Sequence, residues 1–108
     1  MTDTPQPTSV SLSVEEVPVG GLKQITLNGT KVCVANVDGT LYALSDTCTH
    51  ANIPMSSGAL DGHELICPWH GAGFDVRSGA VTCGPAVEPL RCYNVTIEGD
   101  TATIEEKN

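Results

Sequence analysis

The chain is short of positive charge and of aromatic side chains. Its 108 residues contain 5 Lys and Arg against 13 Asp and Glu, a formal net charge of −8. Nucleic acids and anionic membrane surfaces both attract clustered Lys and Arg, so the composition argues against either partner. Aromatic residues make up only 4% of the chain. The core must therefore consist mainly of Val, Ile, Leu and Ala, and a bound metal would add stability.

The sequence also lacks any apolar run of the roughly 18–20 residues that a membrane-spanning helix needs. Residues 1–7 contain neither a basic region nor an apolar stretch, so we expect a flexible lead and not a secretory signal. The length suits one domain. These features predict a small, acidic, soluble module that is monomeric and cytoplasmic.

The five cysteines are an odd number, which fits poorly with a secreted disulfide framework. In a reducing cytoplasm, cysteines are more often metal ligands or buried thiols than disulfides. Cys33 and Cys92 lie in strand-like runs, where small buried thiols are expected. A disulfide between them would need Cα atoms within about 7 Å, which the sequence does not determine.

Apolar and polar residues alternate with the period of a β-strand in the first 45 residues and again after residue 87. The turn dipeptides Asn28-Gly29 and Asp38-Gly39 predict two hairpins in the first part. No stretch sustains a helical period, and residues 14–17 are expected to form at most one helical turn. The pattern therefore predicts an all-β chain of short antiparallel strands.

Residues 46–86 differ in composition and are dense in Gly, Pro, Cys and His. Short strands are expected only at residues 64–67 and 73–76 of this segment. We therefore predict one domain, in which a basal β-framework of residues 8–45 and 87–105 is interrupted by a loop-rich insertion.

Two Cys-His pairs stand within this insertion, as Cys-x-His at residues 48–50 and Cys-x-x-His at residues 67–70. The common zinc-finger arrangement places both cysteines in one loop and both histidines in the other, whereas here each loop supplies one of each. A two-iron cluster with mixed ligation needs both thiolates on one iron and both imidazoles on the other. The pattern favours such a cluster over a zinc site, with four ligands: Cys48, His50, Cys67 and His70.

These motifs resemble those of the Rieske [2Fe–2S] proteins, in which about 15–17 residues separate the two pairs. In this chain the gap is sixteen residues. The resemblance spans roughly residues 9–104 and extends to Gly71 and to Gly84-Pro85-Ala86, which is similar to the proline loop that covers the cluster. It implies one [2Fe–2S] cluster per chain and three layered antiparallel sheets, with a cluster-binding subdomain inserted in a basal framework.

The departures from respiratory members of the family are informative. Those members carry two further cysteines, joined in a disulfide beside the cluster, where this chain has Ile53 and Trp69. They also place Ser and Tyr hydroxyls near the cluster, where this chain has Ala72 and Phe74. No respiratory-type membrane anchor is expected. The chain is most similar to the ferredoxins that serve ring-hydroxylating dioxygenases.

The resemblance implies a one-electron carrier that receives electrons from a reductase, expected to be a flavoprotein, and passes them to a terminal aromatic-ring-hydroxylating oxygenase. No Gly-rich nucleotide-binding loop leads from a strand into a helix, so an enzyme in its own right is not expected. The alternatives are a small Rieske subunit of another redox complex, such as assimilatory nitrite reductase, and a zinc-stabilised interaction module.

The remaining polar residues have simpler interpretations. His63 is expected to be a solvated hairpin histidine, and Asp46 and Asp75 to be loop caps or solvated charges. The histidine-bound iron is expected to be the outer one, so that electrons leave past His50 and His70. An uncharged docking face is expected around these histidines, made of Ala51, Ile53, Pro54, Met55, Pro68 and Trp69.

Overall fold

The computed structural model describes residues 9–47, 54–68, 71–84 and 88–106. Its regular structure consists of strands and two short 3₁₀ turns. The strands are β1 (Ser9–Ser13), β2 (Leu22–Leu27), β3 (Thr30–Val37), β4 (Thr40–Ser45), β5 (Ala59–Asp61), β6 (Glu64–Ile66), β7 (Gly73–Asp75), β8 (Val81–Cys83), β9 (Cys92–Glu98) and β10 (Thr101–Glu105). The turns are η1 (Val14–Glu16) and η2 (Met55–Ser57).

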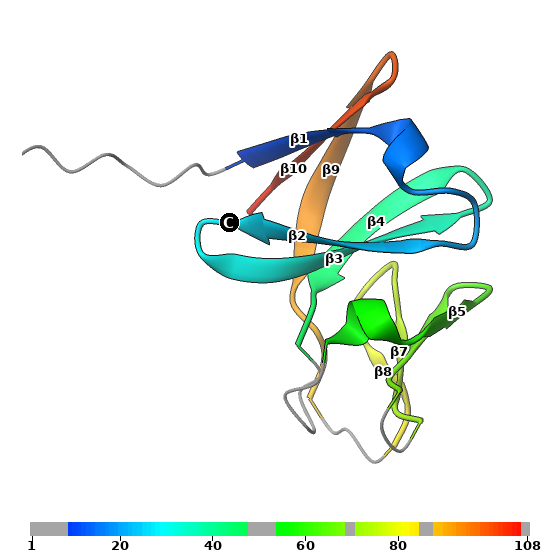
Figure 1. The fold of residues 1–108 in the computed structure, drawn as a ribbon. Coiled ribbons are helices and arrows are strands. Elements are labelled where there is room, and N and C mark those ends of the chain that lie inside the picture. The colour runs from blue at the N-terminus through cyan, green and yellow to red at the C-terminus, as the bar shows by residue number, and fades with distance from the viewer. Residues whose placement is uncertain (1–8, 48–53, 69–70, 85–87, 107–108) are drawn as a thin grey trace, which may run out of the picture.

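All strand pairings are antiparallel, and they form two sheets. The larger has the order β1-β10-β9-β4-β3-β2 and the smaller the order β5-β6-β7-β8. Figure 1 shows the smaller sheet below the larger one, with η2 beside it. The prediction of an all-β chain of antiparallel strands is confirmed.

Strand β3 lies inside the larger sheet and is buried on both faces. Val32 and Val34 contribute to one hydrophobic core, whereas Cys33, Ala35 and Val37 contribute to the other. A strand covered on both faces has a continuous apolar sequence in place of an alternating one. The second core is therefore the layer that joins the two sheets.

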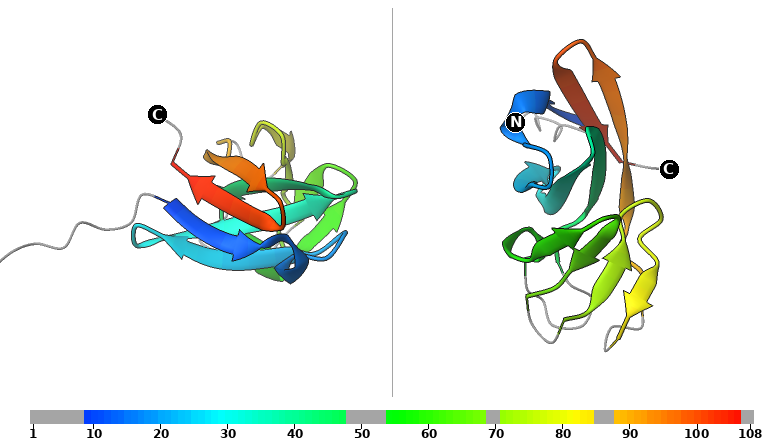
Figure 2. Two further views of the ribbon diagram at one scale, coloured as in Figure 1. Left: turned by 90° about the horizontal axis from the view of Figure 1, so that it is seen from above. Right: turned by 90° about the vertical axis from the view of Figure 1, so that its right-hand side faces the viewer.

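The six-stranded sheet curls around the first core, so that its edge strands β1 and β2 come into contact (Figure 2). Strand β9 makes this curl continuous, because its first residues pair with β4 and the rest pair with β10. The resemblance implied three layered antiparallel sheets. Strands β1, β10 and β9 form one of them and β2, β3 and β4 another, and the Ala43–Tyr93 and Leu44–Cys92 pairs connect these two at β9.

Several local signals are confirmed. Asn28 and Asp38 have φ values of 51°, as the first residue of an Asn-Gly or Asp-Gly hairpin turn requires. The single helical turn expected at residues 14–17 is η1, which begins with a capping box between Ser13 and Glu16. Among the described residues, no helix is long and apolar enough to cross a membrane.

Other elements differ from the predictions. Strands β5 and β8 were not predicted, and their pairing with β6 and β7 defines them. The strand expected to start at residue 87 begins at Cys92 within the described residues. Pro89 has no amide hydrogen, and the Leu90 amide donates to the Gly79 carbonyl oxygen (2.8 Å) instead of to a neighbouring strand.

Candidate metal centre

One end of the four-stranded sheet is a row of four residues, one from each strand. Ala59 pairs with Ile66, Ile66 with Gly73, and Gly73 with Cys83. Segments that leave a sheet from one such row begin side by side. Four residues flank this row: Gly58 precedes β5, Cys67 follows β6, Ala72 precedes β7 and Gly84 follows β8. The predicted ligand loops and the proline loop therefore adjoin the same end of the sheet.

Cys67 is the one predicted ligand that the structure describes, and its side chain is buried at 1% exposure. The Cys67 amide donates to the Ala72 carbonyl oxygen (2.7 Å), which closes a tight connection between β6 and β7. Gly71 has a φ of 71°, a left-handed conformation that favours glycine. His70 lies outside the described residues. The chain is thus arranged so that Cys67 lies at the base of the second predicted ligand loop.

The first predicted ligand loop contains Cys48 and His50, which also lie outside the described residues. Its two ends are described, and a bridge pairs Thr47 with Pro54. Directly after this bridge, Met55 is fully buried in the same hydrophobic cluster as Cys67. The bases of both predicted ligand loops therefore rest on one core.

Gly58 brings the flanks of the two loops into direct contact. A Cβ atom at this position would overlap the carbonyl oxygen of Ile66, the residue before Cys67. The φ of Gly58 is −89°, so close approach, and not a left-handed conformation, explains the glycine. The backbone between the two predicted ligand pairs is therefore packed too tightly for any side chain here.

The described part of the site suits a Rieske cluster. Thiolate ligands of an iron–sulfur cluster are tuned by burial and by hydrogen bonds to sulfur, and Cys67 is buried beside Ala72 and Phe74, which are both fully buried and apolar. Within the described ranges, no group of three or more His, Cys, Asp and Glu is placed to hold a metal. Three of the four predicted ligands lie outside those ranges.

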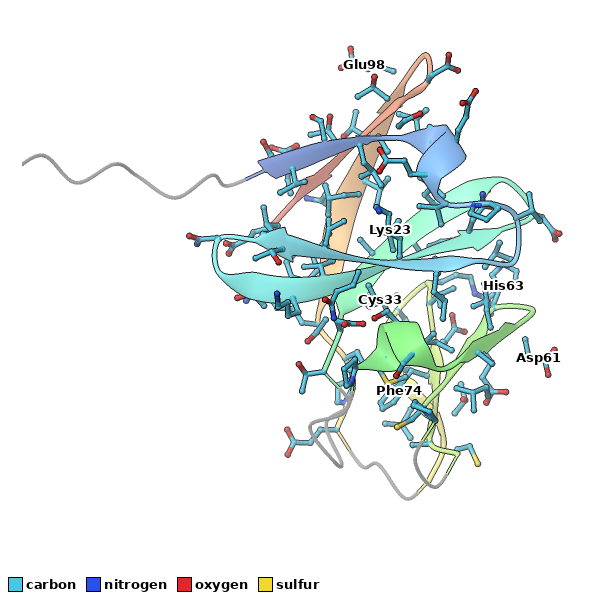
Figure 3. All side chains as sticks on the ribbon, in the orientation of Figure 1. Lys23, Cys33, Asp61, His63, Phe74 and Glu98 are labelled. Carbon is cyan, nitrogen blue, oxygen red and sulfur yellow. The ribbon has the colours of Figure 1, made fainter. Side chains whose placement is uncertain are left out.

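The other cysteines occupy different environments. Strand β4 lies between Cys33 and Cys92, because Leu44 pairs with Cys33 on one side and with Cys92 on the other. Neighbouring strands are about 5 Å apart, so the Cα atoms of the two cysteines are too distant for a disulfide. Cys33 is a free thiol with no exposed surface, and burial, followed by the charge of Asp46, raises its pKa. Figure 3 shows Cys33 near the larger sheet and Phe74 at the smaller one, and both side chains belong to the core that joins the sheets. Cys83 is an exposed thiol.

Asp46 is not the solvated charge that was one of its two expected roles, because it is only 1% exposed. It is a buried loop cap: its carboxylate accepts hydrogen bonds from the Ser56 amide (2.6 Å), the Ser56 hydroxyl (3.0 Å) and Gln24 Nε2 (2.5 Å). A buried carboxylate is stable only where donors satisfy it. Asp46 therefore belongs to the internal structure beneath the first predicted ligand loop.

Asp75 and His63 also make specific contacts. Asp75 accepts two side-chain hydrogen bonds from Arg77, at 2.8 and 3.0 Å, and these lower the pKa of the carboxyl to about 2. His63 is half-buried and packs edge-on against Tyr42, with ring centroids 6.1 Å apart. His63 lies in the β5–β6 hairpin as expected, and it is partly exposed while also contributing to the contact between this hairpin and β4.

Met55, which was expected on the docking face, lies in the core instead. Met55 has no exposed surface and packs in the core, so it cannot contact a partner. Pro54 and Pro68 are exposed, as expected for such a face. Ala51, Ile53 and Trp69 lie outside the described residues. The sequence pattern did not separate Met55 from its exposed neighbours, because Met is common both in cores and on binding surfaces.

Comparisons with known proteins identify the family. The family model of the Rieske [2Fe–2S] domain matches residues 8–94. The ferredoxin component of the naphthalene 1,2-dioxygenase system of Pseudomonas aeruginosa is 35% identical over 88% of this chain and 91% of its own length. The biphenyl dioxygenase ferredoxin subunit of Pseudomonas sp. (strain KKS102) is 40% identical over 86% of each chain.

A solved complex of reduced oxygenase and oxidized ferredoxin in carbazole 1,9a-dioxygenase contains a chain of the same fold. The TM-score is 0.88 at 28% identity, over 94% of this chain and 96% of that chain. The likeness covers both sheets, since so little of either chain is left out. The chain therefore belongs to the Rieske [2Fe–2S] domain family, and within it is similar to the ferredoxin components of dioxygenase systems.

Proposed function

We propose that this protein carries single electrons from a reductase to a terminal ring-hydroxylating oxygenase in the cytoplasm. The ligands are Cys48 and Cys67 on one iron and His50 and His70 on the other. One domain holds them, with residues 46–86 inserted in a framework of residues 8–45 and 87–105. The observation that carries the proposal is that the flanks of both ligand loops rest on one core, with Cys67 buried at its edge.

The cluster, when bound, supplies one-electron redox chemistry at an iron with histidine ligands. The protein has to hold Cys67 rigidly, exclude water from the sulfur side and leave the histidine side accessible. The buried side chains of Met55, Leu65 and Phe74 lie in the core next to Cys67 and provide the apolar surroundings. This function requires no catalytic acid, base or nucleophile.

The relatives favour this function over its alternatives. Both curated relatives reported above are named as ferredoxins of dioxygenase systems, which supports a carrier rather than a subunit of assimilatory nitrite reductase. A zinc-stabilised module would be colourless, whereas a Rieske protein is coloured and loses much of its colour on reduction. The visible spectrum of the purified protein with and without dithionite tests the proposal, and a colourless zinc protein would contradict it.

The reduction potential is expected near the lower end of the Rieske range of roughly −150 to +300 mV. Ala72 and Phe74 occupy buried positions beside Cys67 and have no hydroxyl group to donate a hydrogen bond to sulfur, which would stabilise the reduced state. For the same reason the potential is expected to change little with pH around neutrality. Protein-film voltammetry measures both properties, and a midpoint in the upper half of the range would contradict this prediction.

Docking is expected at the uncharged end of the small sheet, where Pro54, Pro68, Gly71 and Gly84 are exposed. Pro68→Glu adds a charge next to Cys67 and is expected to slow electron transfer to the oxygenase about tenfold, because a buried unpaired charge weakens an interface. Ile97→Glu is the control. Ile97 is 50% exposed and adjoins Glu98 at the opposite end of the molecule (Figure 3).

Stopped-flow kinetics at several salt concentrations measures these rates for both variants, whose cluster spectra should equal that of the unchanged protein. The net charge of −8 is expected to accelerate association with basic partner surfaces, so the second-order rate should fall as salt is added. Equal rates for Pro68→Glu and Ile97→Glu would show that the electron leaves by another face.

A further inference from the structure

Asp46 is the most extensively hydrogen-bonded residue at the base of the first predicted ligand loop. Its carboxylate accepts from the Ser56 amide, the Ser56 hydroxyl and Gln24 Nε2. Its backbone amide donates to the Lys31 carbonyl oxygen (3.0 Å), and its own carbonyl oxygen accepts from the Met55 amide (2.6 Å). One buried residue thus ties the loop to β2, to the start of β3 and to η2.

These contacts hold both ends of the loop. Asp46 precedes Thr47, and Met55 and Ser56 follow Pro54. Because Pro54 has no amide hydrogen, the bond from the Met55 amide to the Asp46 carbonyl oxygen is itself part of the Thr47–Pro54 bridge, and the Ser56 amide donates to the carboxylate beside it. The side chain of Asp46 therefore adds hydrogen bonds beside a bridge that its own backbone helps to form. Asp46 therefore holds together the two described ends of the first predicted ligand loop.

The charge of Asp46 has a second consequence. The three groups that donate to its carboxylate are all neutral, and within the described ranges no Lys or Arg forms an ion pair with it. A buried negative charge that no cation balances acts over a longer distance than an exposed one, because little solvent screens it. It opposes the addition of an electron nearby, since reduction adds negative charge.

We propose that Asp46 is a positioning residue that fixes the first predicted ligand loop, and that its negative charge lowers the reduction potential of the bound cluster. This inference rests on the proposed function, since it takes Cys48 and His50 as ligands. It assigns Asp46 two separable effects: hydrogen bonding governs how firmly the cluster is held, and charge governs how easily it is reduced.

The test uses the cluster-loaded protein with the variants Asp46→Asn and Ser56→Ala. Asp46→Asn removes the charge and part of the hydrogen bonding, whereas Ser56→Ala removes only the hydroxyl donor and keeps the charge. The control is Asn36→Ala, because Asn36 is also a buried polar loop cap on β3: it donates to the Val17 carbonyl oxygen (2.7 Å) and accepts from the Gly39 amide (2.8 Å). Asn36 lies at the opposite end of β3 from Lys31.

Three quantities are measured: the rate of cluster loss to a chelator, the midpoint potential, and hydrogen exchange of the Met55 and Ser56 amides. Asp46→Asn is expected to lose its cluster about tenfold faster or more, as variants of groups that support metal ligands do. In this variant the Met55 and Ser56 amides should exchange faster, and the midpoint potential should rise. Ser56→Ala should lose the cluster faster with an unchanged potential, and Asn36→Ala should leave all three values unchanged.

Equal cluster loss and equal potential in Asp46→Asn and Asn36→Ala would overturn the inference, while the proposed function would stand. If Asp46→Asn does not fold, Ser56→Ala decides the positioning effect, and an unchanged rate of cluster loss would overturn it. A protein without the Rieske spectrum before any substitution would instead contradict the proposed function.

Discussion

Cys67→Ser is expected to yield a protein that holds no Rieske cluster. Cys67 is buried at the base of its loop, so no other thiol can take its place without moving the end of β6. Because metal-binding free energy contributes to folding free energy, residues 46–86 should also lose much of their stable structure. Iron content, visible absorption and the EPR signal after reduction measure the loss, and hydrogen exchange measures the unfolding.

Cys33→Ala is the matched control, since Cys33 is a fully buried cysteine of the same hydrophobic cluster. It should cost about 1–3 kcal/mol of unfolding free energy, as an ordinary core substitution does, and should keep the cluster. A fully loaded Cys67→Ser protein, or a Cys33→Ala protein without iron, would show that the wrong thiol has been assigned as a ligand.

Gly58→Ala is expected to have the second largest effect. The new methyl group would overlap the Ile66 carbonyl oxygen, and only a backbone shift can relieve that contact. We expect a loss of about 3 kcal/mol, at the upper end of the range for overpacking. In a chain of this size that lowers the Tm by roughly 12–24 °C. The shift separates the flanks of the two ligand loops, so the cluster should also be lost faster.

Gly84→Ala provides the comparison, because a Cβ atom there meets nothing within 4 Å and Gly84 is also an exposed flank of a predicted loop. Its thermal unfolding should match that of the unchanged protein. Differential scanning calorimetry and iron release from both variants measure the difference. A stable, fully loaded Gly58→Ala protein would show that this contact is not needed to hold the loops together.

The local chemistry of the chain predicted much of the fold. Asn28-Gly29 and Asp38-Gly39 adopt the hairpin turns that their sequence favours, because positive φ angles are least costly for these residues. The paired Cys-x-His and Cys-x-x-His motifs pointed to mixed ligation, since only a few metal sites need one thiolate and one imidazole from each loop. Both inferences depend on residues that are close together in the sequence.

What failed to follow from the sequence depended on contacts between distant segments. Met55 and Pro54 are adjacent in an apolar stretch, yet Met55 is buried and Pro54 is exposed. Strands β5 and β8 are defined by their pairing with β6 and β7. The burial of Asp46 depends on Gln24, which is 22 positions away along the chain.

The sequence by itself therefore determined the all-β class, the hairpin turns and the family of the cluster, because turn geometry and ligand chemistry are properties of short segments. The tertiary structure decided which apolar residues are buried and how the loop flanks meet at Gly58 and Ile66. It also decided that a carboxylate is buried beneath the first loop. These features arise when β2, β3 and β6 come together, and the spacing of residues along any one segment does not encode that packing.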